Sequence, residues 1–335
     1  MQTAARPLFT CVTENTPEWF HKVHNLVLSL REFGGSLRDA PMVVHFVESV
    51  EPGYARTLRD LGVEVRVVAP YGSRYRFSNK MRMFDLFESE SDFDVLVTLD
   101  CDVIVTGDLG PLVPSQSIGV VPAGRDLFTP EQWLWVYEEF DLSAPAPDCT
   151  MRVSGQETYP YYNTGVMTIP RAIGPELVKT WSDFLARFQP VHERFGRVHH
   201  ENQIAFALAV RAGKLSVHEL PVSLNFSTVV SVDRRFRGEL RPPFVVHYHQ
   251  AIDSSGFIKS STNRRVNKAT HEFNRRRAEL LSLEYSRLPR PPLRARLQKA
   301  AATQTWYDTK TVKRVRRSPL GTAIKRIGAS GTRRA

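Results

Sequence analysis

Two acidic residues at the end of an apolar run are the strongest chemical signal in the sequence. The run Val95-Leu-Val-Thr-Leu is followed by Asp100-Cys-Asp102 and then by a second apolar stretch. Carboxylates two residues apart point the same way if the extended strand continues, and they still reach a common point if it ends there. Such acids are costly to bury unless they are hydrogen-bonded or hold a cation. Their oxygens suit Mg²⁺ or Mn²⁺, whereas the simpler interpretation is a pair of solvated acids in a loop.

Two histidines at a later apolar run are a second candidate for metal binding. In Val245-Val-His-Tyr-His249, the side chains of His247 and His249 fall on the same face of an expected strand. A lone histidine after a strand is usually structural, but a pair in a chain with two such acids offers a third ligand. Imidazole is less hard than carboxylate and shifts the expected ion from Mg²⁺ towards Mn²⁺. The pattern leaves open which of the two histidines binds.

Alternating strand and helix patterns in the first 110 residues would position the acids. This alternation is typical of a parallel sheet covered by helices on both faces. Ligands gather at the carboxyl ends of such strands, where the two acids lie. Strands are expected at 7–13, 42–47, 63–68 and 93–105, and helices at 54–61, at 80–87 and from Pro17 to a stop at Gly34-Gly35.

The pattern is less regular after Gly110. A strand is expected at 166–169, helices at 176–188 and 203–212, and a last strand at 244–249. The stretch 124–161, which includes Pro-rich turns, shows no regular pattern and is where we expect acceptor specificity to lie. We predict one α/β domain over 1–263, a charged amphipathic helix over 264–288 and a basic, flexible tail over 289–335.

The net charge of +10 is concentrated at one end of the chain. Residues 285–335 hold 14 Lys and Arg against one acid, so the remaining 284 residues hold 31 basic and 34 acidic residues. A solvated tail is the simplest interpretation, and attraction to anionic lipid at the inner face of a membrane comes next. Nucleic-acid binding is the least favoured, because residues 289–335 contain one Trp and one Tyr and the body is acidic.

The cysteines and the apolar runs bear on location. Cys11, Cys101 and Cys149 show neither metal-binding nor disulfide spacing, which predicts reduced thiols in a cytoplasmic protein. We expect Cys11 and Cys101 to be buried, because both lie in apolar runs. No apolar run approaches the roughly 20 residues of a membrane helix, and we expect no signal peptide.

Six short segments occur in a characteristic order between residues 8 and 260. They are Phe9-Thr-Cys-Val-Thr-Glu-Asn15, Ser78-Asn-Lys-Met-Arg82, Asp100-Cys-Asp102, Tyr162-Asn-Thr-Gly-Val-Met167, Glu201-Asn-Gln203 and Leu220-Pro-Val-Ser-Leu-Asn225. Through them the chain resembles the GT-A glycosyltransferases. It is most similar to glycosyltransferase family 8, which includes glycogenin, galactinol synthase and bacterial lipopolysaccharide glycosyltransferases.

The resemblance implies a fold and a reaction. The expected GT-A fold is a Rossmann-like, mixed but mainly parallel sheet flanked by helices. The expected reaction moves a hexose from a nucleotide-diphosphate sugar, with UDP as the expected nucleotide, to a hydroxyl of a carbohydrate, glycolipid or small-molecule acceptor. It depends on Mn²⁺ or Mg²⁺ and retains the anomeric configuration.

The resemblance also assigns residues to roles. The expected catalytic residues are Gln203, Asn163 and Lys80. The expected donor-binding residues are Thr13, Asn15, Lys80, Asp100, Asn163, Gly165 and Lys259. The expected metal ligands are Asp100, Asp102 and His247, with His249 as the alternative to His247.

Two departures from the family pattern stand out. A longer spacer separates His247-Tyr-His from Gly256-Phe-Ile-Lys259, and the Pro-Trp that follows in the family is missing. Asn202 replaces an Asp of the family, which bears on the sugar or on the stereochemistry.

Two rival functions share the expected fold. A sugar nucleotidyltransferase should carry a Gly-rich phosphate loop after its first strand, and residues 13–17 contain no glycine. A non-catalytic carbohydrate-binding scaffold would have less need of Lys80, Asp100, Asp102 and His247, all of which are present.

Overall fold

The computed structural model describes residues 5–72, 76–112, 116–196, 200–228, 232–240, 243–261 and 264–282. Within these ranges, no helix combines the length and the apolar character needed to cross a membrane. The end of the helix predicted at 264–288 and the predicted tail over 289–335 lie outside the described residues.

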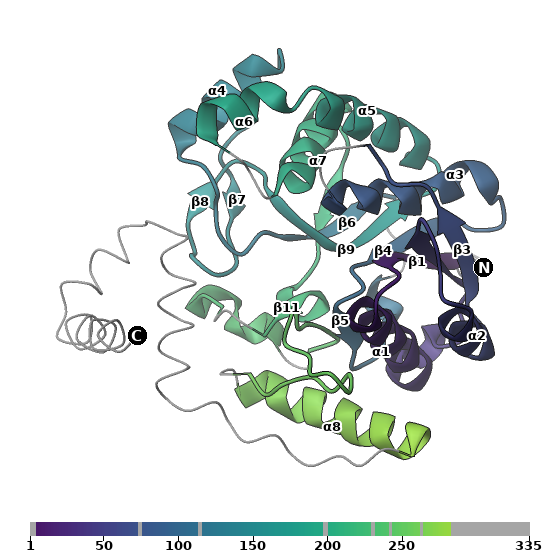
Figure 1. Cartoon of the computed structure of the whole chain (residues 1–335). Coiled ribbons are helices and arrows are strands. Elements are labelled where there is room, and N and C mark those ends of the chain that lie inside the picture. The colour runs from purple at the N-terminus through teal and green to yellow at the C-terminus, as the bar shows by residue number, and fades with distance from the viewer. Residues whose placement is uncertain are drawn as a thin grey trace, which may run out of the picture.

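A seven-stranded sheet forms the centre of the fold, in the order β10-β6-β9-β4-β1-β2-β3 (Figure 1). Strands β3, β2, β1 and β4 run parallel, whereas β9 is antiparallel to both of its neighbours. The predicted α/β fold with a mixed, mainly parallel sheet is therefore confirmed. The strands are β1 (Pro7–Glu14), β2 (Met42–Val47), β3 (Glu64–Val68), β4 (Val95–Leu99), β6 (Ile118–Pro122), β9 (Tyr162–Pro170) and β10 (Val217–Glu219).

Helices cover both faces of this sheet, with α5 and α7 on one side and α1 on the other (Figure 1). Successive strand residues alternate between the two resulting cores. Leu96 of β4 packs in the same core as Trp181, and Val97 packs in the core that contains Leu26. The helices are α1 (Pro17–Phe33), α2 (Pro52–Asp60), α3 (Leu86–Ser89), α4 (Pro130–Glu139), α5 (Gly174–Ala186), α6 (Gln189–Phe195), α7 (Glu201–Ala212) and α8 (Arg264–Leu281), with 3₁₀ segments at Gly35–Leu37, Arg76–Asp85, Gly110–Leu112, Val222–Leu224 and Arg234–Leu240.

Helix α1 begins and ends where the sequence predicts. The side chain of Thr16 caps it by accepting a hydrogen bond from the backbone N–H of Trp19, and Pro17 occupies the first helical position. The helix ends at Phe33, and the backbone N–H of Gly34 donates to the carbonyl of Leu30.

The strand predicted over 93–105 is wrong in one respect that matters for the site. It is two strands in two sheets, β4 and β5 (Val103–Val105), and residues 100–102 form the turn between them. Strand β5 pairs antiparallel with β12 (Val245–His247), which also pairs with β11 (Phe226–Ser227). The chain leaves the main sheet between the two acids, because the N–H of Asp100 still donates to Gly165 of β9, whereas the carbonyl of Asp102 accepts from the N–H of Tyr248, which follows β12. The last strand is correspondingly shorter than the predicted 244–249.

Two other segments differ from the sequence prediction. The helix expected at 80–87 is a 3₁₀ segment, Arg76–Asp85, that continues into the short α3. The stretch 124–161 contains α4 and the β7 (Cys149–Thr150) and β8 (Glu157–Thr158) pair. Thr129 and Gln132 form a capping box at the start of α4, a signal that was readable in the sequence.

Helix α8 is attached to the loop that follows β12 by two asparagines. Asn274 accepts a hydrogen bond from the N–H of Ile258 and donates to its carbonyl, at 3.0 and 2.9 Å. Asn267 does the same to Ser261, at 2.7 and 2.9 Å. Both asparagines are buried, so α8 satisfies the polar backbone of this loop much as a neighbouring strand would.

Candidate active site

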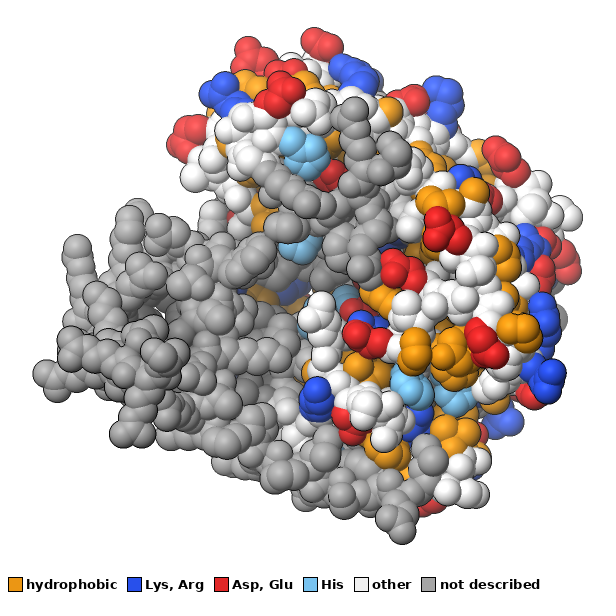
Figure 2. Space-filling view, in the orientation of Figure 1, with side chains coloured by type: hydrophobic (Ala, Val, Ile, Leu, Met, Phe, Trp, Pro, Cys, Tyr) orange, Lys and Arg blue, Asp and Glu red, His pale blue; other side chains and the backbone are white. Residues whose placement is uncertain are grey.

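A cavity of about 390 Å³ opens at the carboxyl ends of β1 and β4. Figure 2 shows this face of the molecule hollowed between the part that carries α5 and α7 and the part that carries α1. Ligands of open α/β sheets bind at this edge. The cavity is lined by Val12, Thr13, Glu14, Trp19, Val47, Asn79, Lys80, Asp100, Cys101, Asp102, Asn163, Thr164, His200, Asn202, Gln203, His247 and His249.

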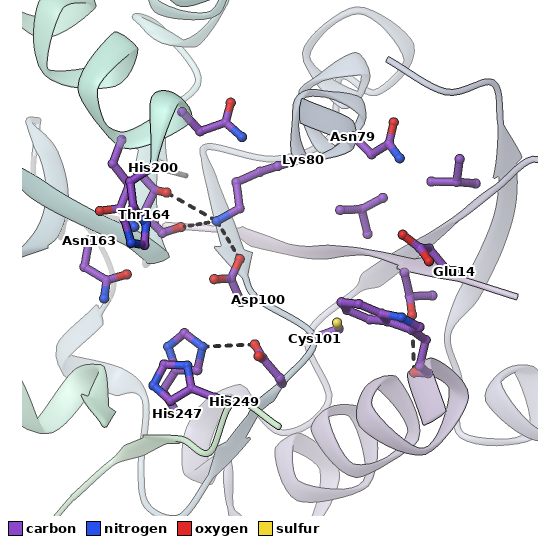
Figure 3. Close-up of a pocket in the computed structure, with 17 residues that line it drawn as sticks. Glu14, Asn79, Lys80, Asp100, Cys101, Asn163, Thr164, His200, His247 and His249 are labelled. Atoms are coloured by element: carbon purple, nitrogen blue, oxygen red, sulfur yellow. Dashed lines mark hydrogen bonds and ion pairs between the residues drawn. The ribbon is translucent and has the colours of Figure 1, made fainter. Parts of the chain in front are cut away.

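The two acids of the turn after β4 have different partners (Figure 3). An oxygen of Asp100 lies 2.5 Å from Nζ of Lys80. An oxygen of Asp102 lies 3.0 Å from Nε2 of His247. Cys101 between them is buried, and the three cysteines are free thiols. The turn therefore presents one carboxylate to each side.

Lys80 is held as a fixed cation in the cavity wall. Its ammonium donates to the carbonyl and to the hydroxyl of Thr164, at 2.9 and 3.3 Å, in addition to its contact with Asp100. These three acceptors match the three donors of an ammonium group. Only 14% of the lysine side chain is exposed, so its charge is directed at the cavity rather than at bulk solvent.

The two histidines meet through a turn, not through strand alternation. Strand β12 ends at His247, and His249 adopts a left-handed backbone conformation with φ of +56°. The rings nevertheless stack, with centroids 4.0 Å apart and planes inclined by 28°. Each has an outer partner, because Nδ1 of His247 lies 3.1 Å from Oδ1 of Asn225 and Nε2 of His249 lies 3.0 Å from Oγ of Ser227.

Asp102 and His247 form a buried ion pair. Burial raises the pKa of Asp102, but the charge of His247 and its hydrogen bond outweigh burial and hold that pKa below its usual range. Burial lowers the pKa of His247, but the charge of Asp102 and the same hydrogen bond outweigh burial and raise it. The carboxylate–imidazolium form is therefore favoured, with a proton held between two groups that could both ligate a cation.

Gly165 lies where the two sides of the turn come together. A Cβ at this position would lie 3.0 Å from oxygens of Asn163 and Asp100 and 3.1 Å from Cε1 of His247. Its N–H donates to the side-chain carbonyl of Asn163 at 2.9 Å, and its carbonyl accepts from the N–H of Asp100. Glycine therefore lets the backbone of β9 approach both the acids and the histidine without crowding them.

The other predicted residues divide into two groups. Thr13 and Gln203 line the cavity; the Thr13 hydroxyl donates to the carbonyl of Trp19, and Oε1 of Gln203 accepts from the hydroxyl of Tyr161 at 2.8 Å. Asn15 and Lys259 are not in the cavity lining. The Asn15 side chain is bound to Ser49 and Glu51. The Lys259 side chain is exposed.

Several lining residues were missed from the sequence. Thr164 and His200 directly adjoin recognised residues, Asn163 and the Glu201-Asn-Gln203 segment, but nothing in the pattern singled them out. Trp19 projects from the first turn of α1, and Nζ of Lys22 lies 4.3 Å from the centre of its ring. Trp19 reaches the cavity only because helix α1 meets the end of β1, and this arrangement is visible only in the folded chain.

The chain is similar to known glycosyltransferases in sequence and in fold. A family model described as Rhodobacterales glycosyltransferase domain matches residues 21–214. No curated protein matches. The similar solved structures include mouse xyloside xylosyltransferase 1 in its apo form, with 14% identity, 72% of this chain and 97% of that chain covered, and a TM-score of 0.44. The galactosyltransferase LgtC, in complex with donor and acceptor sugar analogues, has 16% identity, 84% and 98% coverage, and a TM-score of 0.49. The apo structure of the bifunctional glycosyltransferase WbbM has 13% identity, 81% and 50% coverage, and a TM-score of 0.48.

Proposed function

Because the chain belongs to the family of the Rhodobacterales glycosyltransferase domain, whose model matches more than half of it, we propose that it transfers a hexose from a UDP-sugar to an acceptor hydroxyl. The sequence-based prediction of a glycosyltransferase is thereby confirmed. Membership of glycosyltransferase family 8, the UDP donor and retention of anomeric configuration stay predictions.

One observation carries this proposal. A fixed lysine and an acid–histidine pair lie on either side of one turn, in one cavity at the carboxyl edge of the sheet. A volume of about 390 Å³ lies within the range of small-molecule sites. The cavity thus combines space for a nucleotide-linked sugar with groups that suit a diphosphate.

The difficult step is departure of the nucleoside diphosphate. The bond between the anomeric carbon and the phosphate oxygen breaks while the acceptor oxygen forms its bond to that carbon. Negative charge then grows on the leaving phosphate, and Lys80 stabilises it from a preorganised position. The acceptor's proton passes to the leaving phosphate oxygen on the same face of the sugar, which accounts for retention without a covalent intermediate.

Two amide side chains are arranged to hold the sugar. The carbonyl of Asn163 is occupied by the N–H of Gly165, and that of Gln203 is occupied by the hydroxyl of Tyr161. Each side chain therefore turns its NH₂ donors to the remaining contacts, and sugar hydroxyls are suitable acceptors for them. This supports positioning roles for Asn163 and Gln203 beside the reacting centre.

A divalent cation fits the residues on the histidine side of the turn. Asp102 and His247 supply a carboxylate oxygen and an imidazole nitrogen, and Asn225 orients the imidazole from behind, as outer partners of metal-bound histidines do. The backbone at Gly165 leaves the adjoining space open, which a Cβ would fill. When bound there, Mn²⁺ or Mg²⁺ would supply positive charge to the diphosphate.

Nucleotide binding and turnover test the proposal separately. The protein is first screened for thermal stabilisation by UDP, GDP, ADP and dTDP, each with and without Mn²⁺. Ligand at 100 times its dissociation constant adds about 2.7 kcal/mol, which such a screen detects. We expect metal-dependent stabilisation by UDP, followed by release of UDP from UDP-hexoses. Stabilisation without turnover of any nucleotide sugar would favour the non-catalytic scaffold.

The basic tail and the location remain predictions. Residues 285–335 carry the positive charge but lie outside the described residues, so contact with an anionic membrane rests on composition alone. Binding of the full chain to anionic and to neutral vesicles distinguishes a lipid-binding tail from a solvated one. A cytoplasmic location is consistent with the three free, buried thiols.

A further inference from the structure

We propose that His249 is a ligand of the divalent cation, so that the protein ligands are Asp102, His247 and His249, while Lys80 keeps Asp100 out of the set. This inference rests on the proposed function, because it concerns the same site. It departs from what the family resemblance implies, namely a site of two acids and one histidine. The difference concerns Asp100, which the resemblance makes a metal ligand and which here pairs with Lys80.

The first argument is proximity. Asp102, His247 and His249 each offer one ligand atom, and these three atoms all lie within 4.8 Å of one another. Among the described residues, no other group of three histidine, cysteine or acidic side chains does so. A single cation placed among three such atoms contacts all of them after small side-chain rotations.

The second argument is the conformation of His249. A positive φ is uncommon outside glycine, and it recurs at functional sites where the surrounding structure holds it. Here the left-handed turn brings the ring back over His247 instead of sending it along the strand direction. Ser227, on the neighbouring β11, lies 3.0 Å from Nε2 and fixes the ring orientation. The chain thus maintains an unfavourable backbone conformation that places a second imidazole beside the first.

The third argument is the engagement of Asp100. Its carboxylate lies 2.5 Å from the Lys80 ammonium, whose other two contacts are to Thr164. The contact uses Oδ1, whereas Oδ2 faces Gly165, and Asp100 is not part of the group of three whose ligand atoms lie within 4.8 Å of one another. Asp100 therefore acts by positioning Lys80, and the second imidazole takes the ligand place that the acid would otherwise fill.

This ligand set has a consequence for metal preference. Imidazole nitrogens suit Zn²⁺, Fe²⁺ and Ni²⁺, and affinity for such sites rises from Mn²⁺ to Co²⁺, whereas Mg²⁺ prefers sites built from oxygen. We expect the protein to bind Mn²⁺ and Co²⁺ clearly more tightly than Mg²⁺. A site of two acids and one histidine would show a smaller difference between the affinities for these ions and for Mg²⁺.

The test counts nitrogen ligands directly. The full-length protein is loaded with Mn²⁺, and pulsed electron paramagnetic resonance records the ¹⁴N couplings of bound imidazole. We expect the signature of two imidazoles in the wild type and of one in His249→Asn, in which asparagine tolerates the left-handed backbone. The Mn²⁺ dissociation constant should rise by at least roughly tenfold in His249→Asn, the lower range seen even for outer partners of metal sites. It should change little in Asp100→Asn.

Controls separate folding from ligation and this inference from the function. Exposed His218 on β10 provides the matched control, and His218→Asn should bind Mn²⁺ as the wild type does. Melting temperatures without metal verify that each variant is folded, and the wild-type spectrum alone decides between one and two imidazoles. One imidazole in the wild type, or loss of Mn²⁺ in folded Asp100→Asn, overturns the inference even if the protein turns over UDP-sugars. Two imidazoles in a protein that turns over no nucleotide sugar uphold it while the proposed function fails.

Discussion

The two carboxylates that flank Cys101 meet cations of different kinds. On the lysine side, formed by Lys80, Asp100 and Thr164, the cation is an ammonium held by three acceptors. On the histidine side, formed by Asp102, His247 and His249, the cation is a proton on a buried imidazole, which the proposed metal ion would replace. One turn of three residues thus holds a permanent cation, the Lys80 ammonium, on one side and an exchangeable proton on the other. Two acids on one face of a strand would share a single cation, whereas the turn gives each acid a cation of its own.

The largest effect is expected from removing the carboxylate of the histidine side. Asp102→Asn should lower kcat/KM for the donor by roughly 10²- to 10³-fold, because transition-state charge stabilisation through the cation is lost. Steady-state kinetics with Mn²⁺ titration measures this. Asp92→Asn, at a side chain that is 87% exposed, is the control and should leave kcat/KM unchanged. Near-normal activity of Asp102→Asn would remove the histidine side from the mechanism.

Removing the cation of the lysine side should cost less and leave the metal in place. Lys80→Ala should lower kcat/KM on the order of 10²-fold, since one preorganised charge is lost. Its Mn²⁺ affinity should not fall, because Lys80 does not contact the histidines and its loss frees the Asp100 carboxylate. Parallel calorimetric and kinetic titrations test this division. Loss of Mn²⁺ binding in Lys80→Ala would mean that the two sides act as one unit.

A methyl group at Gly165 should disturb both sides at once. The added Cβ would lie 3.0–3.1 Å from Asn163, Asp100 and His247, so at least one of them must shift. Overpacking of this kind costs about 1–3 kcal/mol, and about 1.4 kcal/mol corresponds to a tenfold loss of donor affinity. Gly165→Ala should therefore weaken both UDP and Mn²⁺ binding by about tenfold. Gly238→Ala, where a Cβ meets nothing within 4 Å, is the matched control.

The smallest effect concerns histidines outside the cavity lining and affects stability only. Burial lowers the pKa of His45 to about 4, and neither ring nitrogen has a hydrogen-bond partner within the described residues. Between pH 6.5 and 4 the unfolded chain gains a proton at this residue that the folded chain does not, so stability falls as the pH drops. This costs on the order of 1–2 kcal/mol between pH 7 and 5.

Replacing His45 by Phe tests this directly. The variant should lose less stability than the wild type when urea unfolding is compared at pH 7 and pH 5, while kcat/KM at pH 7 stays unchanged. Equal acid sensitivity of the two proteins would show that His45 is not the titrating group. His24, whose pKa burial also lowers to about 4, would then be the next variant.

The sequence predicted the main sheet well because local patterns decide it. Strand β2 matches the predicted 42–47 since all six of its residues are buried, and Pro17 marks the start of α1. The irregular stretch 124–161 was not predicted, although the capping box at Thr129 was visible. The 3₁₀ character of Arg76–Asp85 was also missed, because an amphipathic pattern does not distinguish it from an α-helix.

The sequence indicated some of the residues that line the cavity, but not how they are connected. The pairing of His247 with His249 was expected from strand alternation, yet the strand ends at His247 and a turn brings the rings together. Nor could two acids two residues apart reveal that they would separate, because their partners come from β12 and from a 3₁₀ segment. Lys259 was expected among the donor-binding residues, but it follows a loop closed by the Ile252–Ile258 bridge and its side chain is exposed.

Part of the site lies beyond the residues that the family model matches, and α8 is attached to that part. Residues 21–214 contain both acids and Lys80 but neither histidine. The loop that follows His249 is held by Asn274 and Asn267 of α8. With the proposed ligand set, metal binding and docking of this helix are thermodynamically linked, so each raises the equilibrium constant of the other by the same factor. Weaker attachment of α8 would then be measured as a lower metal affinity.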